Sequence, residues 1–384
     1  MFDVPFAVPS RFPALGTTIF TVMSRLAAEC GAVNLSQGFP DFQAEPELFD
    51  AVHRHMRAGR NQYAPMAGTP ELRAAIAAKV AALYGAAYDA ESEITVTAGA
   101  TQALFTAIAA CVGPGDEVIV FEPVYDSYGP AVEAVGGRVR HSRLSFPDYR
   151  PDWNHVASLI NSRTRMVVVN SPHNPTGSLL SAADLDTLAT LLRNTAIVIL
   201  SDEVYEHIAF DGPHTSLAAH PELAARSLVV SSFGKTYHIT GWKIGYVVAP
   251  AALSAEFRKL HQFNVFTVNT PAQLGIADYM ADPARHQGLA AFYRQKRDHF
   301  RSLLAATPFD PLPCAGTYFQ LARYDRISPR PDREFAVWLT REIGVATIPL
   351  SAFHHDGHDQ RVVRFCFAKR EETLEAAAER LGRL

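Results

Sequence analysis

The chain has 384 residues, of which 48% are hydrophobic and 19% are charged, so it can bury a substantial core. A chain of this length fits a large domain plus a smaller one. The formal net charge is -4, with 35 Lys and Arg against 39 Asp and Glu, and no basic stripe stands out, so we expect no nucleic-acid partner. No apolar run approaches the ~18 residues that a membrane helix needs, so we expect no membrane partner either.

The first residues and the cysteines bear on the location of the protein. Residues 1–16 lack the basic segment and apolar core that mark a signal peptide. The cysteines have neither the spacing of a zinc site nor that of a disulfide framework, which favours buried free thiols at Cys30, Cys111, Cys314 and Cys366. These features predict a soluble, cytoplasmic protein in a reducing compartment.

Short β-branched segments alternate with helical segments through the middle of the chain. Strands are expected at residues 93–97, 117–122, 165–170, 196–202 and 227–232, and helices at 101–112, 126–137 and 181–195. In the last helix, Ser181 and Asp184 match a capping box, and Leu185, Leu188 and Leu192 fall on one face. Nearly continuous apolar strands that alternate with helices predict an α/β fold with a mainly parallel sheet covered on both faces.

Unusual polar residues follow most of these strands directly. The loops after the strands contain Gly99, Ala100 and Thr101, then Tyr125, the segment 170–177 with Asn174, the segment 202–205 with Asp202 and Tyr205, and the segment 232–235 with Ser232 and Lys235. Ligands of parallel sheets bind at the carboxyl ends of the strands, in the loops that follow them. The sequence therefore predicts a binding site at this edge.

Each of these segments also has a structural interpretation. Residues 99–101 could be a tight turn or an anion-binding helix start. The segment 170–177 could be a loop set by its two prolines, although the amide of Asn174 could also donate to a ligand. Asp202 ends an apolar strand, where a carboxylate is costly unless a cation or a hydrogen-bond donor meets it; a helix N-cap is the alternative.

Lys235 is the strongest candidate for a catalytic residue. The chain has six lysines, and two of them, Lys235 and Lys243, lie among aromatic residues and glycines in "SSFGKTYHITGWKIG". A lysine in an apolar pocket has a lowered pKa, because burial disfavours its charged form, and it can then form a Schiff base with a carbonyl cofactor. Such a cofactor needs an anion clamp, to which Lys243 would contribute, and a carboxylate facing its ring nitrogen. The strand ends supply these groups.

The same segment resembles the cofactor-lysine segment of the class I aminotransferases, which are pyridoxal-phosphate enzymes of fold type I. Further blocks are similar to that family in matching order along the chain, namely "NLSQGFPDF", "NQYAPMAGTPELR", "NSPHNPTG", "SDEVYEHIAF" and "VVRFCFA". The resemblance extends from Gly16 to the C-terminus. Within the family, "LGTTIFT", "VNTPAQ", "PCAGTYF" and "IPLSAF" resemble the branch of methionine aminotransferases and the related kynurenine aminotransferases.

The resemblance implies the chemistry at Lys235. This residue would form the aldimine with pyridoxal 5′-phosphate and then move the proton between Cα and the cofactor. Asp202 would keep the pyridine nitrogen protonated, so that the ring accepts electrons. Tyr205 and Asn174 would hydrogen-bond the ring 3-oxygen, and Tyr125 would stack on the ring.

The resemblance also implies the groups that hold the phosphate and the substrate carboxylate. The phosphate-binding residues would be Gly99, Ala100, Thr101, Ser232 and Lys243, with Tyr63 reaching across from the neighbouring subunit. Arg364 would clamp the substrate α-carboxylate in bidentate fashion, helped by Gly38 and Asn174. A solvated arginine on a strand is the alternative for Arg364, but its neighbours Val363 and Phe365 disfavour it.

Residues that would surround the substrate side chain favour an apolar or aromatic donor. Aspartate-type members of the family place a second arginine near the segment that corresponds to 261–273, where this chain has no Arg or Lys. Phe266 in this segment and Ile19 with Phe20 near the N-terminus are expected to line the opening. Methionine is favoured, and phenylalanine, tyrosine, histidine and kynurenine are also plausible donors, with a 2-oxo acid as acceptor in a ping-pong scheme.

The resemblance further implies the domain organisation. A large cofactor-binding domain with a mainly parallel seven-stranded sheet is expected over residues 46–269. Residues 1–45 and 270–384 would form a smaller α+β domain, which ends in an amphipathic helix with Leu374, Ala378 and Leu381 on one face. The active site would lie between the domains and be shared in a homodimer, if Tyr63 acts across subunits.

Alternative functions are open at this point. A β-lyase that cleaves cysteine S-conjugates or cystathionine would share the fold, Lys235, Asp202 and Arg364. A non-catalytic cofactor-binding regulator would also share the domain, but such regulators carry an N-terminal DNA-binding extension that this sequence does not show. A nicotinamide dehydrogenase is disfavoured, because "AGAT" after the strand 93–97 is not a full G-x-G-x-x-G motif.

Overall fold

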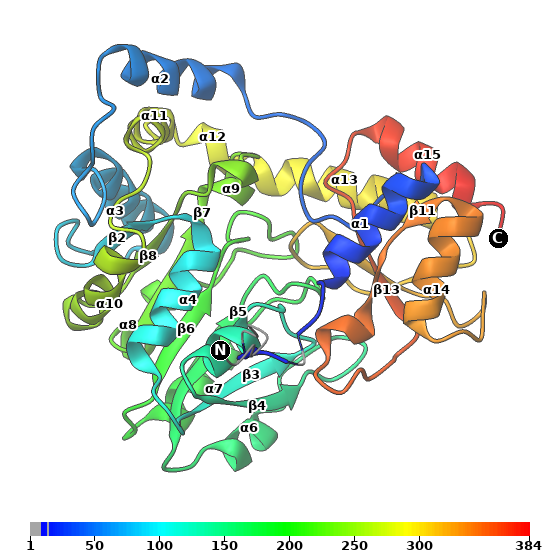
Figure 1. Ribbon diagram of the computed structural model, residues 1–384, viewed down its shortest axis with the longest axis horizontal. Helices are drawn as coiled ribbons and strands as arrows, with labels where there is room; N and C mark the ends of the chain where they lie inside the picture. The colour runs from blue at the N-terminus through cyan, green and yellow to red at the C-terminus, as the bar shows by residue number, and fades with distance from the viewer. Residues whose placement is uncertain (1–8, 14) are drawn as a thin grey trace, which may run out of the picture.

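The structure is a computed structural model that describes residues 9–13 and 15–384 (Figure 1). Much of the segment 1–16, in which we expect no signal peptide, therefore lies outside the described residues, as does the start of the predicted small domain. Within the described part of the chain, no helix is both long enough and apolar enough to cross a bilayer.

A seven-stranded sheet with the strand order β2-β8-β7-β6-β5-β3-β4 forms the centre of the larger part of the molecule (Figure 1). Its strands are β2 (Ile94–Thr97), β3 (Glu117–Glu122), β4 (Arg138–Arg143), β5 (Thr164–Asn170), β6 (Val198–Asp202), β7 (Ser227–Ser232) and β8 (Gly245–Val248). All neighbouring pairs are parallel except those of β8, which runs antiparallel to both β2 and β7. The predicted mainly parallel seven-stranded sheet is confirmed.

Sequence patterns locate five of these strands and miss β4 and β8. Strand β4 reads "RVRHSR" and lies at the sheet edge, so it carries no continuous apolar run. Strand β8 has only four residues and returns antiparallel to β7 after the short helix at 233–236, so it lacks the long crossover helix that marks a parallel strand.

Helices cover both faces of the sheet because alternate strand residues point to opposite sides. Val118 and Val120 belong to a core with α4 (Gly99–Cys111), α5 (Tyr128–Ala134) and α10 (Ala251–Asn264). Ile119 and Phe121 belong to the core on the other face, with α3 (Pro70–Tyr84), α6 (Trp153–Leu159) and α7 (Ala182–Leu192). Each side chain buried in this way contributes about 1.5–3 kcal/mol through removal from water.

Helix α7 begins as the sequence predicts. The hydroxyl of Ser181 accepts from the backbone N–H of Asp184, and the Asp184 carboxylate accepts from the backbone N–H of Ser181, which completes the capping box. Leu185, Leu188 and Leu192 are fully buried against the sheet, so the predicted apolar face is confirmed.

A second group of elements packs beside the large sheet, at the right of Figure 1. It contains an antiparallel sheet with the order β12-β13-β10-β9 and a parallel pair of β1 with β11. The strands are β1 (Val33–Asn34), β9 (Asp310–Pro311), β10 (Phe319–Arg323), β11 (Val345–Ala346), β12 (Ile348–Pro349) and β13 (Val362–Cys366). The helices around them are α1 (Ile19–Cys30), α13 (Leu289–Leu304), α14 (Asp332–Trp338) and α15 (Glu371–Leu381). In α15 the buried residues are Leu374, Ala377 and Leu381, and Ala378, predicted on the same face, is half-buried.

The remaining elements are α2 (Pro46–Arg57), α8 (Pro221–Ala224), α9 (Phe233–Thr236), α11 (Thr270–Met280) and α12 (Ala284–Gln287), the 3₁₀ turns η1 (Leu217–Ala219), η2 (Thr240–Trp242) and η4 (Leu350–Phe353), and the π-helical turn η3 (Leu339–Ile343). Helix α11 packs on α2 and α3, on the side of the large sheet (Figure 1). The division at 46 and 269 stays a prediction, and this packing favours a boundary after Met280.

Candidate active site

Parallel strands β5, β6 and β7 end at one edge of the large sheet and bring the predicted polar residues together. Asn170, the last residue of β5, pairs in register with Asp202, the last residue of β6, and its amide donates to the Asp202 carbonyl oxygen at 2.8 Å. A cavity of about 180 Å³ opens at this edge. Its lining includes Ala100, Thr101, Tyr125, Asn174, Asp202, Tyr205, Ser232, Lys235 and Lys243.

Lys235 lies on the short helix α9, directly after β7. Ser232 caps this helix, since its hydroxyl accepts from the N–H of Gly234 at 3.1 Å. The Lys235 ammonium donates to the Tyr318 hydroxyl at 2.8 Å and to the Gly38 carbonyl oxygen at 3.1 Å. Burial lowers the pKa of Lys235 to about 8, so a large fraction of the amine is neutral slightly above neutral pH. A neutral amine is the nucleophilic form of lysine.

Asp202 is a buried carboxylate that faces the same cavity. Its side chain accepts from the Tyr128 hydroxyl at 2.7 Å and from the Val204 N–H at 3.3 Å. Burial raises the pKa of Asp202 to about 6, although the Tyr128 hydrogen bond acts in the opposite direction. No helix begins directly after Asp202, so the alternative of a helix N-cap is wrong, and the Val204 contact is a turn hydrogen bond. A cation placed against Asp202 would offset the cost of its burial.

Lys243 lies over the N-terminus of α4. A Cβ atom at Gly99 would approach the Lys243 Cε at 3.2 Å and its Nζ at 3.3 Å, and Gly99 has a φ of +78°. Glycine at this position therefore lets the ammonium group lie against the first turn of the helix. The first N–H groups of a helix and a nearby ammonium form an anion-binding site, so both residues fit the predicted phosphate clamp.

Arg364 is a buried guanidinium on β13 that forms no ion pair with an acidic residue in the described part of the chain. Its Nη1 donates to Asn174 Oδ1 at 2.7 Å and its Nη2 to the Ser36 carbonyl oxygen at 3.2 Å. Its Nε has no hydrogen-bond partner among the described residues, and none of their ion pairs includes Arg364. Burial lowers the pKa of Arg364 to about 10. An anion with two oxygens would satisfy this group.

A larger cavity of about 780 Å³ adjoins the first and is lined by the predicted residues Gly38, Thr101, Tyr125, Asn174, Tyr205, Lys235 and Arg364. Its outer part is apolar and includes Phe12, Phe20 and Phe105. Ile19 does not line it, although its neighbours Thr18 and Phe20 do. Ile19, at the start of α1, packs against the same hydrophobic core as Phe20 but contributes nothing to the cavity wall.

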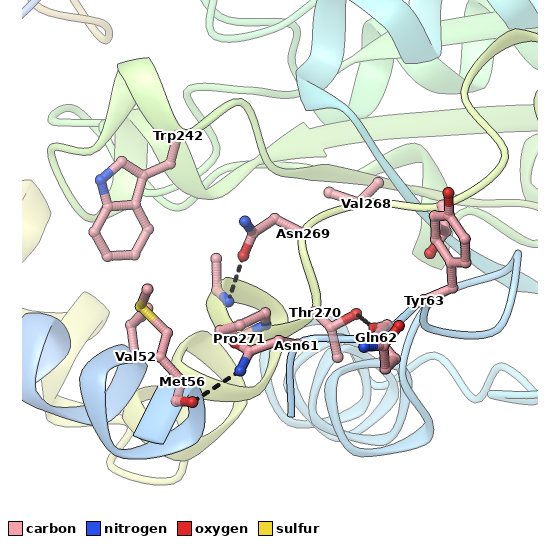
Figure 2. A pocket seen from close by; sticks show the side chains of 12 residues that line it. Val52, Met56, Asn61, Gln62, Tyr63, Trp242, Val268, Asn269, Thr270 and Pro271 are labelled. Carbon is pink, nitrogen blue, oxygen red and sulfur yellow. Dashed lines mark hydrogen bonds between the residues drawn. The ribbon is translucent and has the colours of Figure 1, made fainter. Parts of the chain in front are cut away.

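Tyr63 and Phe266 lie outside both cavities of the same chain. The Tyr63 side chain is 81% exposed and that of Phe266 is 48% exposed, and their rings meet edge to face at 5.3 Å. The predicted place of Phe266 beside the substrate is therefore not found within one chain. Tyr63 instead lines a separate pocket of about 570 Å³. Figure 2 shows Tyr63 and Trp242 on opposite sides of this pocket.

The structure adds residues that the sequence reading did not assign. Tyr318 holds Lys235 in place, and Tyr128 donates to Asp202. The ring of Phe319 lies 3.9 Å from the Arg364 guanidinium. Tyr318 and Phe319 come to the site because β10 pairs antiparallel with β13, a long-range pairing that no local pattern reveals.

Comparison with known proteins agrees with this arrangement. Residues 31–381 match the family "Aminotransferase class I and II". Methionine aminotransferase of Escherichia coli is 52% identical over 386 residues, with 100% of both chains covered. The probable N-succinyldiaminopimelate aminotransferase of Mycobacterium tuberculosis is 39% identical, with 97% of both covered, and the mouse kynurenine–oxoglutarate transaminase 1 is 33% identical, with 93% of both covered.

Solved structures show the same likeness in three dimensions. The structure of the Escherichia coli methionine aminotransferase superposes with a TM-score of 0.97 and covers 99% of this chain and 100% of its own. That of the Mycobacterium tuberculosis enzyme gives a TM-score of 0.94, with 98% and 100% covered. The buried lysine, the unpaired guanidinium and the family match lead to one conclusion. This chain belongs to the class I and II aminotransferases and has their fold type I architecture.

Proposed function

We propose that this aminotransferase acts in amino-acid metabolism by transferring the amino group of an apolar or aromatic L-amino acid, methionine foremost, to a 2-oxo acid. The observation that carries the proposal is the position of Lys235, which lies in both cavities and thereby links a cofactor-sized site to the cavity that contains Arg364. The names of the Escherichia coli and mouse relatives support the choice of donors.

The residues of the smaller cavity fit pyridoxal 5′-phosphate. The space over Gly99 that a Cβ would fill, with Lys243 beside it, suits the phosphate. Asp202, with its raised pKa, suits a protonated ring nitrogen, and Tyr205 with Asn174 suits the ring oxygen. When bound, this cofactor supplies a carbonyl carbon that condenses with amines and a ring that accepts electrons.

The protein groups then have distinct tasks. The Lys235 amine, freed from Tyr318 and Gly38, accepts the proton of the substrate Cα in the first half-reaction. In the second half-reaction it donates a proton to the Cα of the amino acid that forms from the 2-oxo acid. Its lowered pKa suits this exchange near neutral pH. Arg364 binds the α-carboxylate, which replaces the Asn174 oxygen as one of its acceptors and fixes the Cα in front of Lys235.

The outer part of the larger cavity selects the side chain of the donor. Phe12, Phe20 and Phe105 supply apolar surface, and Asp126 lies in the same lining. A second carboxylate on the substrate would be repelled by Asp126 and would find no second arginine in the segment 261–273. Apolar contacts discriminate by only about 1–3 kcal/mol per group, so we expect several donors to be accepted.

We also propose a homodimer in which Tyr63 reaches the phosphate of the neighbouring subunit. The exposure of Tyr63 and Phe266 on one surface supports this, because large exposed aromatic residues often mark interfaces. A cytoplasmic location is proposed as well, on the basis of the free cysteines. Of these, Cys314 and Cys366 are buried as predicted, whereas Cys111 is half-buried and Cys30 is exposed.

Steady-state rates with a panel of donors and 2-oxo acids test the proposed function. We expect methionine and phenylalanine to differ by about 10–200-fold at most in kcat/KM, and aspartate to be poorer than either. Aspartate as the preferred donor would contradict the proposal. Release of ammonia and a thiol from cysteine S-conjugates without an oxo acid would instead identify the alternative β-lyase.

A further inference from the structure

A buried ion pair lies beneath the turn that follows β6. The Lys79 ammonium of α3 donates to Glu206 Oε1 at 2.6 Å, and the two side chains are only 5% and 3% exposed. His207 Nε2 lies 3.8 Å from the same oxygen, but burial lowers the pKa of His207 to about 3, so this ring is neutral. Among residues 9–13 and 15–384, Lys79 therefore supplies the full positive charge at Glu206.

The Glu206 carboxylate also accepts hydrogen bonds from hydroxyl groups of other elements. Tyr84 of α3 donates at 2.5 Å, Tyr246 of β8 donates at 2.9 Å, and Ser231 of β7 donates as well. Ser231 and Tyr246 pair in register, so both point to the same face of the large sheet. This is the face whose core contains Tyr246 and the residues of α3. Glu206 thus joins the turn to two strands and a helix.

The residues next to these contacts belong to the opposite face, where the smaller cavity lies. Tyr205 precedes Glu206 and Ser232 follows Ser231, and both line that cavity. Successive residues of a strand point to opposite faces, as Ser231 and Ser232 do. The turn itself is tight, because the N–H of Glu206 donates to the Glu203 carbonyl oxygen at 2.9 Å. The place of Tyr205 is therefore tied to that of Glu206 through a single peptide unit.

Stability of the fold alone does not explain this buried ion pair. The loss of hydration on burial offsets most of the attraction between two charges, and apolar side chains of similar volume often stabilise a protein equally well. Burial acts to raise the pKa of Glu206, but Lys79 and the hydrogen bonds hold that pKa well below its usual range, so the carboxylate stays charged. A carboxylate held by several donors has one position, whereas an apolar side chain could shift. The ion pair thereby fixes the position of the turn.

We propose that Glu206, held by Lys79, is a positioning residue for Tyr205. It fixes the place from which the Tyr205 hydroxyl donates to the ring oxygen of pyridoxal phosphate, so the inference rests on the proposed function. Without this anchor the turn can move, and the hydrogen bond from Tyr205 becomes longer and weaker. Glu206 itself touches neither cofactor nor substrate, because it lines neither of the two cavities.

A pH titration of the yellow band of the holoenzyme tests this role. A donor to the ring oxygen favours the deprotonated chromophore, so Tyr205→Phe should raise the pH of the colour change. A hydrogen bond to a charged group corresponds to about one pH unit or more. Glu206→Gln removes the charge that Lys79 holds and should raise this pH in the same direction. Added to Tyr205→Phe, it should raise the pH no further, because the two residues act through one hydrogen bond.

Glu117→Gln is the matched control, with thermal unfolding followed in parallel. Glu117 is also a buried carboxylate and accepts from Arg163 at 2.8 Å, but it lies at the start of β3, away from the cavity. Its variant should have a lower Tm and an unchanged colour change. If Glu206→Gln does not fold, Lys79→Met combined with Glu206→Leu replaces the pair by apolar groups of similar volume and should give the same rise.

The outcomes separate this inference from the proposed function. An unchanged colour change in the folded Glu206 variant, or an equal rise with and without Tyr205→Phe, would overturn the role of Glu206 and leave the proposed function intact. No rise in Tyr205→Phe itself would refute the contact assigned to Tyr205, and the inference with it. A wild type without a yellow band would refute the proposed function.

Discussion

At the residue scale, the proposed function depends most on Lys235, because its amine lies in both cavities. Lys235→Ala removes this amine and leaves Asp202 and Lys243 in place. We expect the variant to bind pyridoxal phosphate without covalent attachment and to lose nearly all turnover. Dialysis against buffer, followed by absorption measurements, checks the first expectation, and an assay with methionine checks the second. Turnover close to that of the wild type would refute the role of Lys235.

Arg364 is expected to act mainly on substrate binding. Arg364→Ala should raise the KM for methionine by roughly 10²-fold, because truncating one side of a buried charge contact costs about 2–5 kcal/mol. Cofactor binding should change little, since Arg364 lines only the larger of the two cavities. An unchanged KM in this variant would remove the assignment.

Asp202 links the site to the pH dependence of stability. Its pKa in the folded protein is about 6, above its usual value, so the folded state binds more protons than the unfolded state between about pH 4 and 6. The stability of the cofactor-free protein should therefore fall as the pH rises through this window, by about 3 kcal/mol from this group. Asp202→Asn removes the charge and keeps an acceptor for the Tyr128 hydroxyl.

We expect Asp202→Asn to be more stable than the wild type without cofactor at pH 7.5 and to bind the cofactor more weakly. Thermal unfolding of both proteins at pH 4.5 and 7.5 measures the difference, which should shrink at the lower pH. A variant less stable than the wild type at pH 7.5 would show that Asp202 stabilises the fold by itself.

At the element scale, the first turn of α4 should hold the phosphate. Gly99→Ala introduces a Cβ at a φ of +78° and within 3.3 Å of the Lys243 ammonium. Gly115→Ala is a matched control, because its φ is +86° and, apart from its chain neighbours, no atom of the described residues lies within 4 Å of the added Cβ. Both should lose about 1 kcal/mol of stability through backbone strain. Only Gly99→Ala should bind pyridoxal phosphate at least about tenfold more weakly, as 1.4 kcal/mol corresponds to tenfold. An equal loss of cofactor affinity in both variants would show that Gly99 does not contribute to phosphate binding.

The elements also show what the sequence can predict. Apolar strands and the capped helix α7 were predictable because their signals are local, in the alternation of residues and in the pairing of Ser181 with Asp184. Strand β4 was not, since its edge position needs no apolar pattern. Tyr318 contacts Lys235 and Tyr128 contacts Asp202 through long-range packing. The ends of the strands and the family resemblance therefore predict only part of the site, and these two tyrosines are not among the predicted residues.

At the scale of the whole molecule, the exposed aromatic surface predicts a dimer. Light scattering during gel filtration should give twice the 42.0 kDa of one chain. Phe266→Ser should weaken the dimer and reduce turnover together, since Tyr63 lies against the same ring. Phe146→Ser is the control, because Phe146 has a similar exposure of 40% and contacts Tyr149 instead. An active monomer would contradict the shared site.

The central claim is that Lys235 and its surroundings use pyridoxal phosphate to accept an amino group from methionine. The most direct measurement is the visible absorption spectrum of the purified protein with pyridoxal phosphate, before and after methionine is added without any oxo acid. We predict a yellow band that bleaches on addition of methionine and returns with a 2-oxo acid. A band that stays unchanged with methionine and with aromatic amino acids, or no band at all with added cofactor, would contradict the account.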